Sequence, residues 1–423
     1  MKESILHYIW QNKLYALQEL KTTAGETIQI LNPGKLNTDA GPDFFNAKIK
    51  INDTLWAGNV EIHNLASDWK KHGHQNNVAY DSVILHVVGQ SDEEIRRTDG
   101  EIIPQMELEC PPHIAENYEQ LMSEQKWIAC ADKIGRVPSI FIQSWKSNLL
   151  TERLQHKMQA IENYLELTNQ HWEEAFYITL ARNFGFGKNT DAFEKLAKSV
   201  PLSILGKHKD NLFQLEALLF GQSGLLDIAY GEYPEQLRKE YTFLKNKYEL
   251  SALQPIEWKL LRLRPDNFPH VRIAQFAALV HSSSKLFSKI IEQAESEKIR
   301  ALLTCEPSEY WTTHYLFGDE SNPKTKKLSP ESITSILINT IVPSIFCYAG
   351  RKGSDSLKEK ALQILESIPA EKNAIIEGWK ILGLEADNAF DSQALIQLKK
   401  NYCEERNCLR CRIGHKVLSL QNG

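Results

Sequence analysis

Apolar positions in the first 110 residues change from a helical spacing to strand-like runs. Between Glu3 and Leu20 they recur at the spacing of one helix face, at positions 5, 6, 9, 10, 14 and 17. The next apolar run, Thr27–Leu31, ends at Asn32-Pro33-Gly34, a combination typical of turns. The pattern therefore predicts an N-terminal helix followed by a strand over residues 27–31.

Two further strands are predicted to pair as a hairpin. In Phe44–Ile51 the side chains alternate in polarity, so one face is predicted to carry Phe45, Ala47, Ile49 and Ile51. Asn52-Asp53 is a two-residue turn typical of hairpins, and it leads into a strand over residues 55–63.

A short helix and a covered strand complete the predicted order of elements. Ser67 is a suitable N-cap for a helix that reaches His72. Val83–Val88 is almost continuously apolar, as expected of a strand covered on both faces. Residues 102–108 are predicted to add an edge strand that Pro104 interrupts. The order is therefore helix, three strands, helix, strand.

The rest of the chain shows helical periodicity in segments of varied length, which predicts an irregular helical domain and not a regular repeat. The segments are 140–165, 171–182, 212–220, 234–247, 271–280, 285–303, 329–341, 356–367, 374–382 and 391–402. We therefore predict an α/β domain over residues 1–115 and a large all-α domain over residues 116–423.

Composition and charge restrict the class of protein. A chain of 423 residues with 42% hydrophobic and 24% charged residues is typical of a soluble protein with two or three domains. No apolar run approaches the ~20 residues of a membrane span, and residues 1–7 lack the features of a secretory signal. A cytoplasmic protein without membrane contact is expected. Because the net charge is -5, any nucleic-acid contact requires a local basic patch.

Asp43, Glu61 and His63 are the candidate catalytic residues. Glu61 and His63 lie two positions apart on one predicted strand and share a face, while Asp43 opens the partner strand after Gly41-Pro42. If the hairpin brings the two carboxylates together, a divalent cation would relieve their repulsion. Hard cations such as Mg²⁺ prefer carboxylate oxygens and keep positions open for water and phosphate. This pattern indicates phosphodiester chemistry.

Around these residues the chain resembles the PD-(D/E)xK nuclease superfamily, whose restriction-endonuclease-like core has the order αβββαβ. Pro42-Asp43 matches the first acid of its motif, Glu61 the second, and His63 the position usually held by lysine. The resemblance covers about the first quarter of the chain. It implies that Asp43 and Glu61 bind Mg²⁺ or Mn²⁺ and that His63 lies beside the attacking water. A neutral imidazole, however, supplies less charge than an ammonium group.

The whole sequence also resembles an uncharacterised bacterial family of unknown function. The shared features are the stretches around Gly41–Phe44 and Glu61–His63 and a C-terminal group of cysteines. This second resemblance implies no activity.

Four histidines, His63, His72, His74 and His86, fall within 24 residues. Imidazoles are common ligands of Zn²⁺, Ni²⁺ and Fe²⁺, so some of them could join Asp43 and Glu61 in a mixed nitrogen and oxygen site. The alternative is a set of surface histidines with His86 buried and hydrogen-bonded to the backbone.

The second metal motif is Cys403-x4-Cys408-x2-Cys411-x3-His415. Three thiolates and one imidazole at such spacing suit tetrahedral Zn²⁺, with an iron–sulfur cluster as the alternative metal centre. His415 or a distant residue must complete the shell. The other interpretation is a group of reduced cysteines packed at a helix end.

A stretch of mixed basic and aromatic residues around Trp258 is the candidate contact for nucleic acid. Arg262, Arg264 and Arg272 could bind phosphates there, although arginines that cap carbonyls at a helix–loop–helix corner would give the same pattern. The favoured function is a metal-dependent nuclease. The alternatives are a non-catalytic nucleic-acid or protein interaction module on the same fold, and a His/carboxylate metallohydrolase of small phosphoesters.

Overall fold

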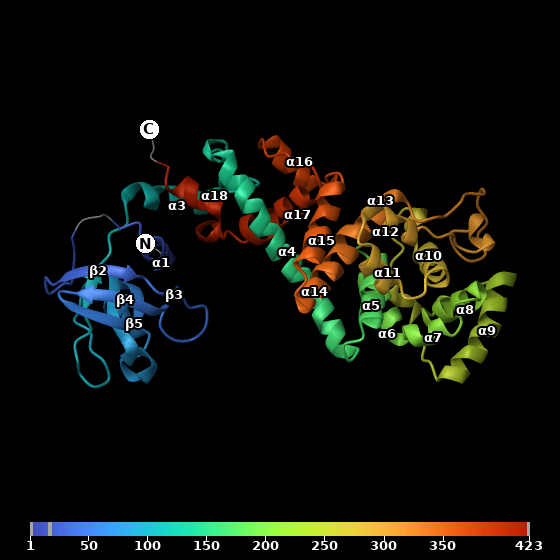
Figure 1. Cartoon of the computed structure of the whole chain (residues 1–423), viewed down its shortest axis with the longest axis horizontal. Helices are drawn as coiled ribbons and strands as arrows, with labels where there is room; N and C mark the ends of the chain where they lie inside the picture. The colour runs from blue at the N-terminus through green and yellow to red at the C-terminus, as the bar shows by residue number, and fades with distance from the viewer. Residues whose placement is uncertain (1–2, 16–18, 421–423) are drawn as a thin grey trace. The chain divides into compact units, whose positions relative to one another are not determined.

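The computed structural model describes residues 3–15 and 19–420, and it divides the chain into two compact units (Figure 1). The first unit consists of Met1–Trp145 together with Leu398–Gly423, and the second consists of Lys146–Gln397. A sheet with flanking helices forms most of the first unit, and the second unit is helical. The predicted class, an α/β N-terminal region with a large helical remainder, is therefore confirmed.

The sheet of the first unit follows α1 (Glu3–Gln11) and contains seven strands in the described residues. These are β1 (Leu20–Lys21), β2 (Thr27–Asn32), β3 (Lys35–Leu36), β4 (Phe44–Ile51), β5 (Thr54–Leu65), β6 (Val83–Gln90) and β7 (Gln105–Glu107). Their order is β1-β2-β4-β5-β6-β7, with β3 paired to β4. Strands β2, β4 and β5 are antiparallel neighbours. The connection through α2 (Asp68–Lys71) returns the chain so that β6 runs parallel to β5.

Most of the predicted elements are present, but some of them begin or end at residues other than those predicted. Ile51 pairs with Thr54 across the predicted hairpin turn. Helix α1 ends at Gln11, well before the predicted end at residue 20, and residues 16–18 lie outside the described residues. Strand β7 begins only at Gln105, because Pro104 has no backbone N–H to donate to a ladder.

A β-bulge in β4 sets the register at the end of the hairpin that carries the acids. From Ile51 to Ala47, each residue of β4 pairs with one residue of β5, and Ala47 lies opposite Gly58. The register then shifts by one residue, so that Phe44 lies opposite Val60. Asn46, in the bulge, has a left-handed φ of 57°. The shift makes Phe44 the buried residue in place of the predicted Phe45.

Apolar side chains of α1 and of the central strands form the core of the sheet. Helix α1 contacts β5, and its fully buried face consists of Ile5, Leu6, Ile9 and Trp10. A second cluster lies beyond β5, around α2 and β6, and includes Trp69, Val83, Val88 and Ile103. Each buried side chain of this size contributes roughly 1.5–3 kcal/mol relative to an exposed one, so both clusters stabilise the sheet.

The second unit contains all or part of each predicted helical segment. Its helices are the later part of α4 (Ser139–Leu167), α5 (Trp172–Phe184), α6 (Thr190–Ser199), α7 (Leu202–Gly206), α8 (Leu212–Gln222), α9 (Glu232–Tyr248), α10 (Pro269–Ser282), α11 (Leu286–Gln293), α12 (Ser296–Leu303), α13 (Pro330–Ile336), α14 (Val342–Lys352), α15 (Asp355–Ser367), α16 (Ala374–Ile381) and α17 (Ala389–Gln397). Their irregular lengths agree with the prediction of a domain without a fixed repeat.

One helical run is longer and more apolar than the sequence pattern indicated. Pro330–Lys352 is long and apolar enough to span a membrane, contrary to the expectation that no run approaches that length. However, 67% of its most apolar window is buried inside the protein. That degree of burial is typical of a core helix in a soluble protein.

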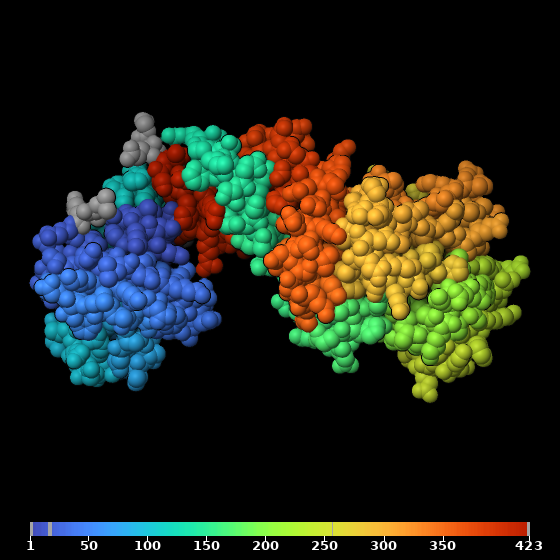
Figure 2. All heavy atoms as spheres, viewed as in Figure 1, coloured from blue at the N-terminus to red at the C-terminus, as the bar shows by residue number. Residues whose placement is uncertain are grey.

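The structure divides the chain differently from the predicted boundary at residues 115 and 116. Helix α3 (Pro112–Ser123) and the C-terminal helix α18 (Arg412–Leu418) both belong to the first unit. The Asn117 side chain on α3 donates hydrogen bonds to the carbonyls of Leu418 and Leu420. The C-terminal segment, red in Figure 2, lies beside α3 for this reason. The cysteine motif is therefore part of the sheet-containing unit and not of the helical one.

Candidate metal centre

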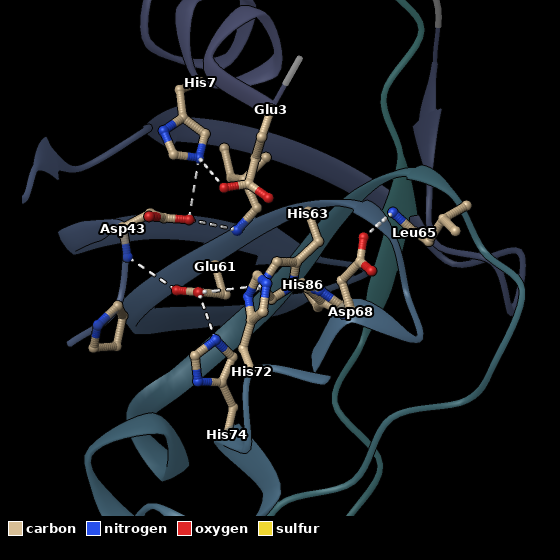
Figure 3. A network of polar contacts seen from close by, with 12 residues as sticks. Glu3, His7, Asp43, Glu61, His63, Leu65, Asp68, His72, His74 and His86 are labelled. Atoms are coloured by element: carbon tan, nitrogen blue, oxygen red, sulfur yellow. Dashed lines mark hydrogen bonds and ion pairs between the residues drawn. The ribbon is translucent and has the colours of Figure 1, made fainter. Parts of the chain in front are cut away.

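Asp43, which directly precedes β4, lies next to Glu61 on β5. Since Phe44 is opposite Val60, the shifted register continues with Asp43 opposite Glu61. Without the bulge, Asp43 would be opposite Ile62. The backbone N–H of Asp43 donates to Glu61 Oε2 at 3.0 Å, and the N–H of Ile62 donates to Asp43 Oδ2 at 2.9 Å (Figure 3). Each carboxylate is thus oriented by the backbone of the opposite strand.

The two acids differ in their exposure to solvent. The Glu61 side chain is 6% exposed, whereas that of Asp43 is 23% exposed. Burial raises the pKa of Glu61, and the nearby charge of Asp43 raises it further. The contact with His74 and the N–H of Asp43 act in the opposite direction. A positive ion at this position would remove the cost of burying the Glu61 charge.

Helix α1 adds Glu3 and His7 to the acid pair, two residues that the sequence interpretation missed. His7 Nε2 lies 3.2 Å from Asp43 Oδ2 and 3.9 Å from Glu3 Oε1. Burial lowers the pKa of His7, but its contact with the Asp43 carboxylate and the charges of Glu3 and Glu61 outweigh burial and raise the pKa overall. The signal in the sequence was weak: the two polar residues are one helical turn apart on the predicted helix.

Three of the four histidines come together beside Glu61. His63, His72 and His74 each offer a ring nitrogen, and these atoms all lie within 4.8 Å of one another. Glu61 Oε1 is 3.2 Å from His74 Nε2 and 3.5 Å from His63 Nε2. His63 Nε2 is also 3.1 Å from His72 Nδ1. Figure 3 shows these rings converging on the Glu61 carboxylate from β5 and from the loop after α2.

His86 contacts the second ring nitrogen of His63. Its Nε2 lies 2.8 Å from His63 Nδ1, and its Nδ1 lies 3.4 Å from Gln105 Nε2. Burial lowers the pKa of both His63 and His86 to about 3, and neighbouring imidazoles contribute to the shift. Both rings are therefore neutral at physiological pH. The alternative of surface histidines with His86 bonded to the backbone is wrong, because only His72 is exposed and His86 bonds to side chains.

The neutral His63 ring changes its predicted role. A lysine at this position would bring a positive charge to the phosphate, but a buried neutral imidazole brings none. A neutral ring nitrogen can instead coordinate a metal ion. His74 Nε2 is also suited to that role, because it is buried and makes no hydrogen bond to any described residue.

The donor set fits a transition-metal ion better than Mg²⁺. Mg²⁺ is held mainly by oxygen atoms, whereas three imidazole nitrogens with one carboxylate oxygen suit Zn²⁺, Mn²⁺, Fe²⁺ or Ni²⁺. Ligands about 2.0–2.2 Å from a tetrahedral ion lie roughly 3.3–3.6 Å from one another. The distances from Glu61 Oε1 to His63 and His74 agree with that spacing.

The predicted C-terminal ligands are not all available to a metal. Cys403, Cys408 and Cys411 are free thiols of the first unit. His415, by contrast, has its Nε2 3.1 Å from the carbonyl oxygen of Leu409, and its ring packs edge-on against Tyr8 at 4.8 Å. His415 is therefore engaged in holding the C-terminal segment.

Comparison with known proteins assigns the chain to a family. The model of the family described as "Protein of unknown function (DUF2851)" matches residues 3–374. The chain belongs to this family. The matched region of this DUF2851 protein contains Asp43, Glu61 and the four histidines and ends before Cys403. No curated protein and no solved structure matches the chain.

The three arginines predicted to bind nucleic acid lie in the second unit of the DUF2851 protein and differ in environment. Arg264 and Arg272 line one cavity, and the lining does not include the exposed Arg262. Arg272 is only 6% exposed and donates to Gln275 Oε1 and Ser332 Oγ at 2.9 and 3.0 Å. A contact of Arg272 with a long nucleic acid would thus have to occur inside that cavity and not on an open surface.

Proposed function

We propose that the first unit is a metal-dependent phosphodiesterase that acts on nucleic acid, on a core of the PD-(D/E)xK type. The order of elements supports this fold. Helix α1 precedes the antiparallel strands β2, β4 and β5, and α2 leads to β6, which runs parallel to β5. The resemblance carried by Pro42-Asp43 and Glu61 implies the same order, αβββαβ.

One observation carries the proposal: the carboxylates of Asp43 and Glu61, 18 residues apart in sequence, are fixed side by side by reciprocal hydrogen bonds to backbone N–H groups. Folding aligns two like charges there, at a cost that a bound cation would offset. Glu61, His63, His72 and His74 would hold the ion. When bound, such an ion polarises a phosphoryl oxygen and lowers the pKa of a coordinated water.

Two side chains of the protein, Asp43 and His7, would control the transfer of the proton from the attacking water. Asp43 is the more exposed acid, and the N–H of Ile62 holds its carboxylate in one orientation. The carboxylate can therefore accept a proton from an attacking water. His7 Nε2, at 3.2 Å, can hold a proton against Asp43 Oδ2 and thereby keep the carboxylate aligned. In this scheme Asp43 is the base, and His7 is a positioning residue.

Cleavage of nucleic acid by the full chain tests the proposal. Labelled single-stranded and double-stranded DNA and RNA should be cut in the presence of Mn²⁺ and not after chelation. Glu61→Gln and Asp43→Asn should each lose at least about 100-fold in rate, the loss typical of removing a positioned acid or base. Asp53→Asn is the matched control, because Asp53 is a fully exposed acid at the turn of the same hairpin. Equal rates in all four proteins would refute the proposal.

The histidines favour a second candidate function, the hydrolysis of small phosphoesters. A nitrogen-rich donor set such as His63, His72 and His74 with Glu61 is typical of transition-metal hydrolases. A small diester such as bis(4-nitrophenyl) phosphate separates the candidates. The nuclease proposal predicts that saturating nucleic acid competes with its turnover, whereas a small-molecule hydrolase would turn it over unaffected by nucleic acid.

A further inference from the structure

A cavity in the second unit is lined mainly by cationic and neutral polar side chains. Its volume is about 630 Å³, which is in the range of pockets that hold small ligands. The lining comes from four segments: Phe186 after α5, the stretch of Arg264 and η5 (Pro265–Asn267), helix α10, and the segment from Lys324 into α13. Residues far apart in the sequence are therefore brought to one cavity.

The lining has an excess of positive charge. The cations are Arg264, Arg272, Lys324, Lys326 and Lys327, and the acids are Asp266 and Glu331. Two of the lysines have acidic partners: Lys324 Nζ is 2.7 Å from Asp266 Oδ2, and Lys327 Nζ is 3.2 Å from Glu306 Oε2. About half of the surface of each of these four side chains is exposed, so water and salt screen both pairs.

Arg272 is held in the wall of the cavity by neutral groups. Its side chain is buried, and the residue is only 6% exposed. The guanidinium donates to Gln275 Oε1 at 2.9 Å, to Ser332 Oγ at 3.0 Å and to Asn267 Oδ1. Its Cζ lies 4.1 Å from the centre of the Phe186 ring. The Nε atom has no hydrogen-bond partner among the described residues, so one donor of this buried cation is free.

Lys326 is the second buried cation of the lining and is 4% exposed. Its ammonium group donates to the carbonyl of Thr312 at 3.0 Å and lies 4.1 Å from the centre of the Tyr315 ring. Gln275 connects the two cations: its amide oxygen accepts from Arg272, and its amide nitrogen donates to the carbonyl of Lys326 at 2.9 Å. The positions of both positive charges are therefore fixed by the same side chain.

Neither buried cation forms an ion pair within the described residues; both bond to neutral oxygens. Burial lowers the pKa of Arg272 to about 10 and also lowers that of Lys326, and the charge of Asp266 opposes both shifts. The Arg272 guanidinium is thus still charged at physiological pH. Burying charges without a counter-ion is costly, and an anion in the cavity would offset that cost.

We propose that this cavity binds a terminal phosphate group. A phosphate monoester carries about 1.5 to 2 negative charges near neutral pH, which matches the two buried cations that lack an ion pair. Arginine suits phosphate because two of its N–H groups can donate in parallel, and the Nε of Arg272 is free to take part. An internal phosphodiester carries one charge and is flanked by nucleosides on both sides. A terminal group therefore fits buried cations better.

The terminal phosphate has two possible sources, a small phosphomonoester such as a nucleotide and the 5′ end of a nucleic-acid strand. The chemistry that recognises them is the same. Every residue of the lining belongs to the second unit, whereas Asp43 and Glu61 belong to the first. The inference is therefore independent of the proposed activity, and either of the two can fail without the other.

Calorimetric titration of the full chain, freed of metal by chelation and dialysis, tests the inference. Inorganic phosphate, adenosine 5′-monophosphate and a short 5′-phosphorylated single-stranded DNA should each bind at constant ionic strength. Adenosine and the same DNA with a 5′-hydroxyl end should bind at least about tenfold more weakly, because they lack the charge-assisted hydrogen bonds. The tighter of the nucleotide and the phosphorylated strand identifies the source.

Variants of the lining link this binding to the cavity. Lys326→Met keeps an unbranched side chain beside Tyr315 but removes the charge, so the affinity for phosphate should fall at least about tenfold. The Tm of the free protein should not fall, because a buried charge without a counter-ion is lost. Arg264→Gln removes an exposed cation of the lining and should weaken binding at least about threefold. Arg262→Gln, two residues away and outside the lining, is the matched control and should bind as the wild type does.

Three results would overturn the inference. The first is no binding of any phosphate-bearing probe. The second is the same affinity for phosphate in the wild type, Lys326→Met and Arg264→Gln. The third is equal binding of the 5′-hydroxyl and 5′-phosphorylated strands with no binding of the nucleotide. If Lys326→Met fails to fold, the comparison of Arg264→Gln with Arg262→Gln decides alone.

Discussion

Replacing Asn46 by valine tests whether the bulge in β4 aligns the two acids. Asn46 has a φ of 57°, and its N–H donates to Asn59 Oδ1 at 3.2 Å. A left-handed backbone costs an ordinary L-residue about 1–2 kcal/mol, whereas asparagine and glycine adopt it more easily. Asn46→Val should therefore lose about 1–2 kcal/mol of unfolding free energy, and Asn46→Gly should lose little. For a unit of this size the loss corresponds to roughly 2–8 °C in Tm.

Calorimetry of the three proteins with and without Mn²⁺ measures both consequences of the bulge. The stabilisation by Mn²⁺ should be retained in Asn46→Gly and reduced in Asn46→Val, because the bulge is what sets Asp43 opposite Glu61 and not Ile62. The reasoning would be refuted if valine were tolerated as well as glycine, or if the valine variant kept the full response to Mn²⁺.

Two further predictions concern buried side chains elsewhere in the chain. Phe44 is fully buried in the sheet core, so Phe44→Ala should cost about 3–5 kcal/mol in chemical denaturation; a loss below 1 kcal/mol would contradict this packing. Burial lowers the pKa of Lys157 to about 7, and the unfolded chain therefore binds more protons between pH 7 and 10.5. The stability advantage of Lys157→Met should thus be largest near pH 7 and fall by up to about 1.4 kcal/mol per pH unit as pH rises, and a constant difference from pH 7 to 10 would refute that assignment.

The order of the longer elements in the first unit could be predicted, because each of them has a local signal in the sequence. The two-residue strands β1 and β3 were not predicted. The hairpin around Asn52-Asp53 and the covered strand beginning at Val83 follow from turn chemistry and apolar runs alone. The bulge at Asn46 could not be predicted, since it depends on how β4 packs against β5. For this reason Phe45 was placed in the core, where the structure has Phe44.

In the candidate site, too, the residues of a short sequence motif could be predicted, whereas residues brought in by tertiary packing could not. Asp43, Glu61 and His63 were found because they occur in a short motif, and the structure brings them together. His7 was missed because it reaches the acid pair through tertiary packing, from α1. Spacing alone also favoured His415 as a fourth ligand, since no local pattern indicates that its ring packs against Tyr8.

The most direct test of the metal centre is anomalous diffraction from crystals of the full chain grown with Mn²⁺. The account predicts a manganese peak in contact with the Glu61 carboxylate and with ring nitrogens of His63 and His74. A peak absent from this position at saturating Mn²⁺, with Glu61 still bonded to the N–H of Asp43 and the imidazoles unchanged, would contradict it.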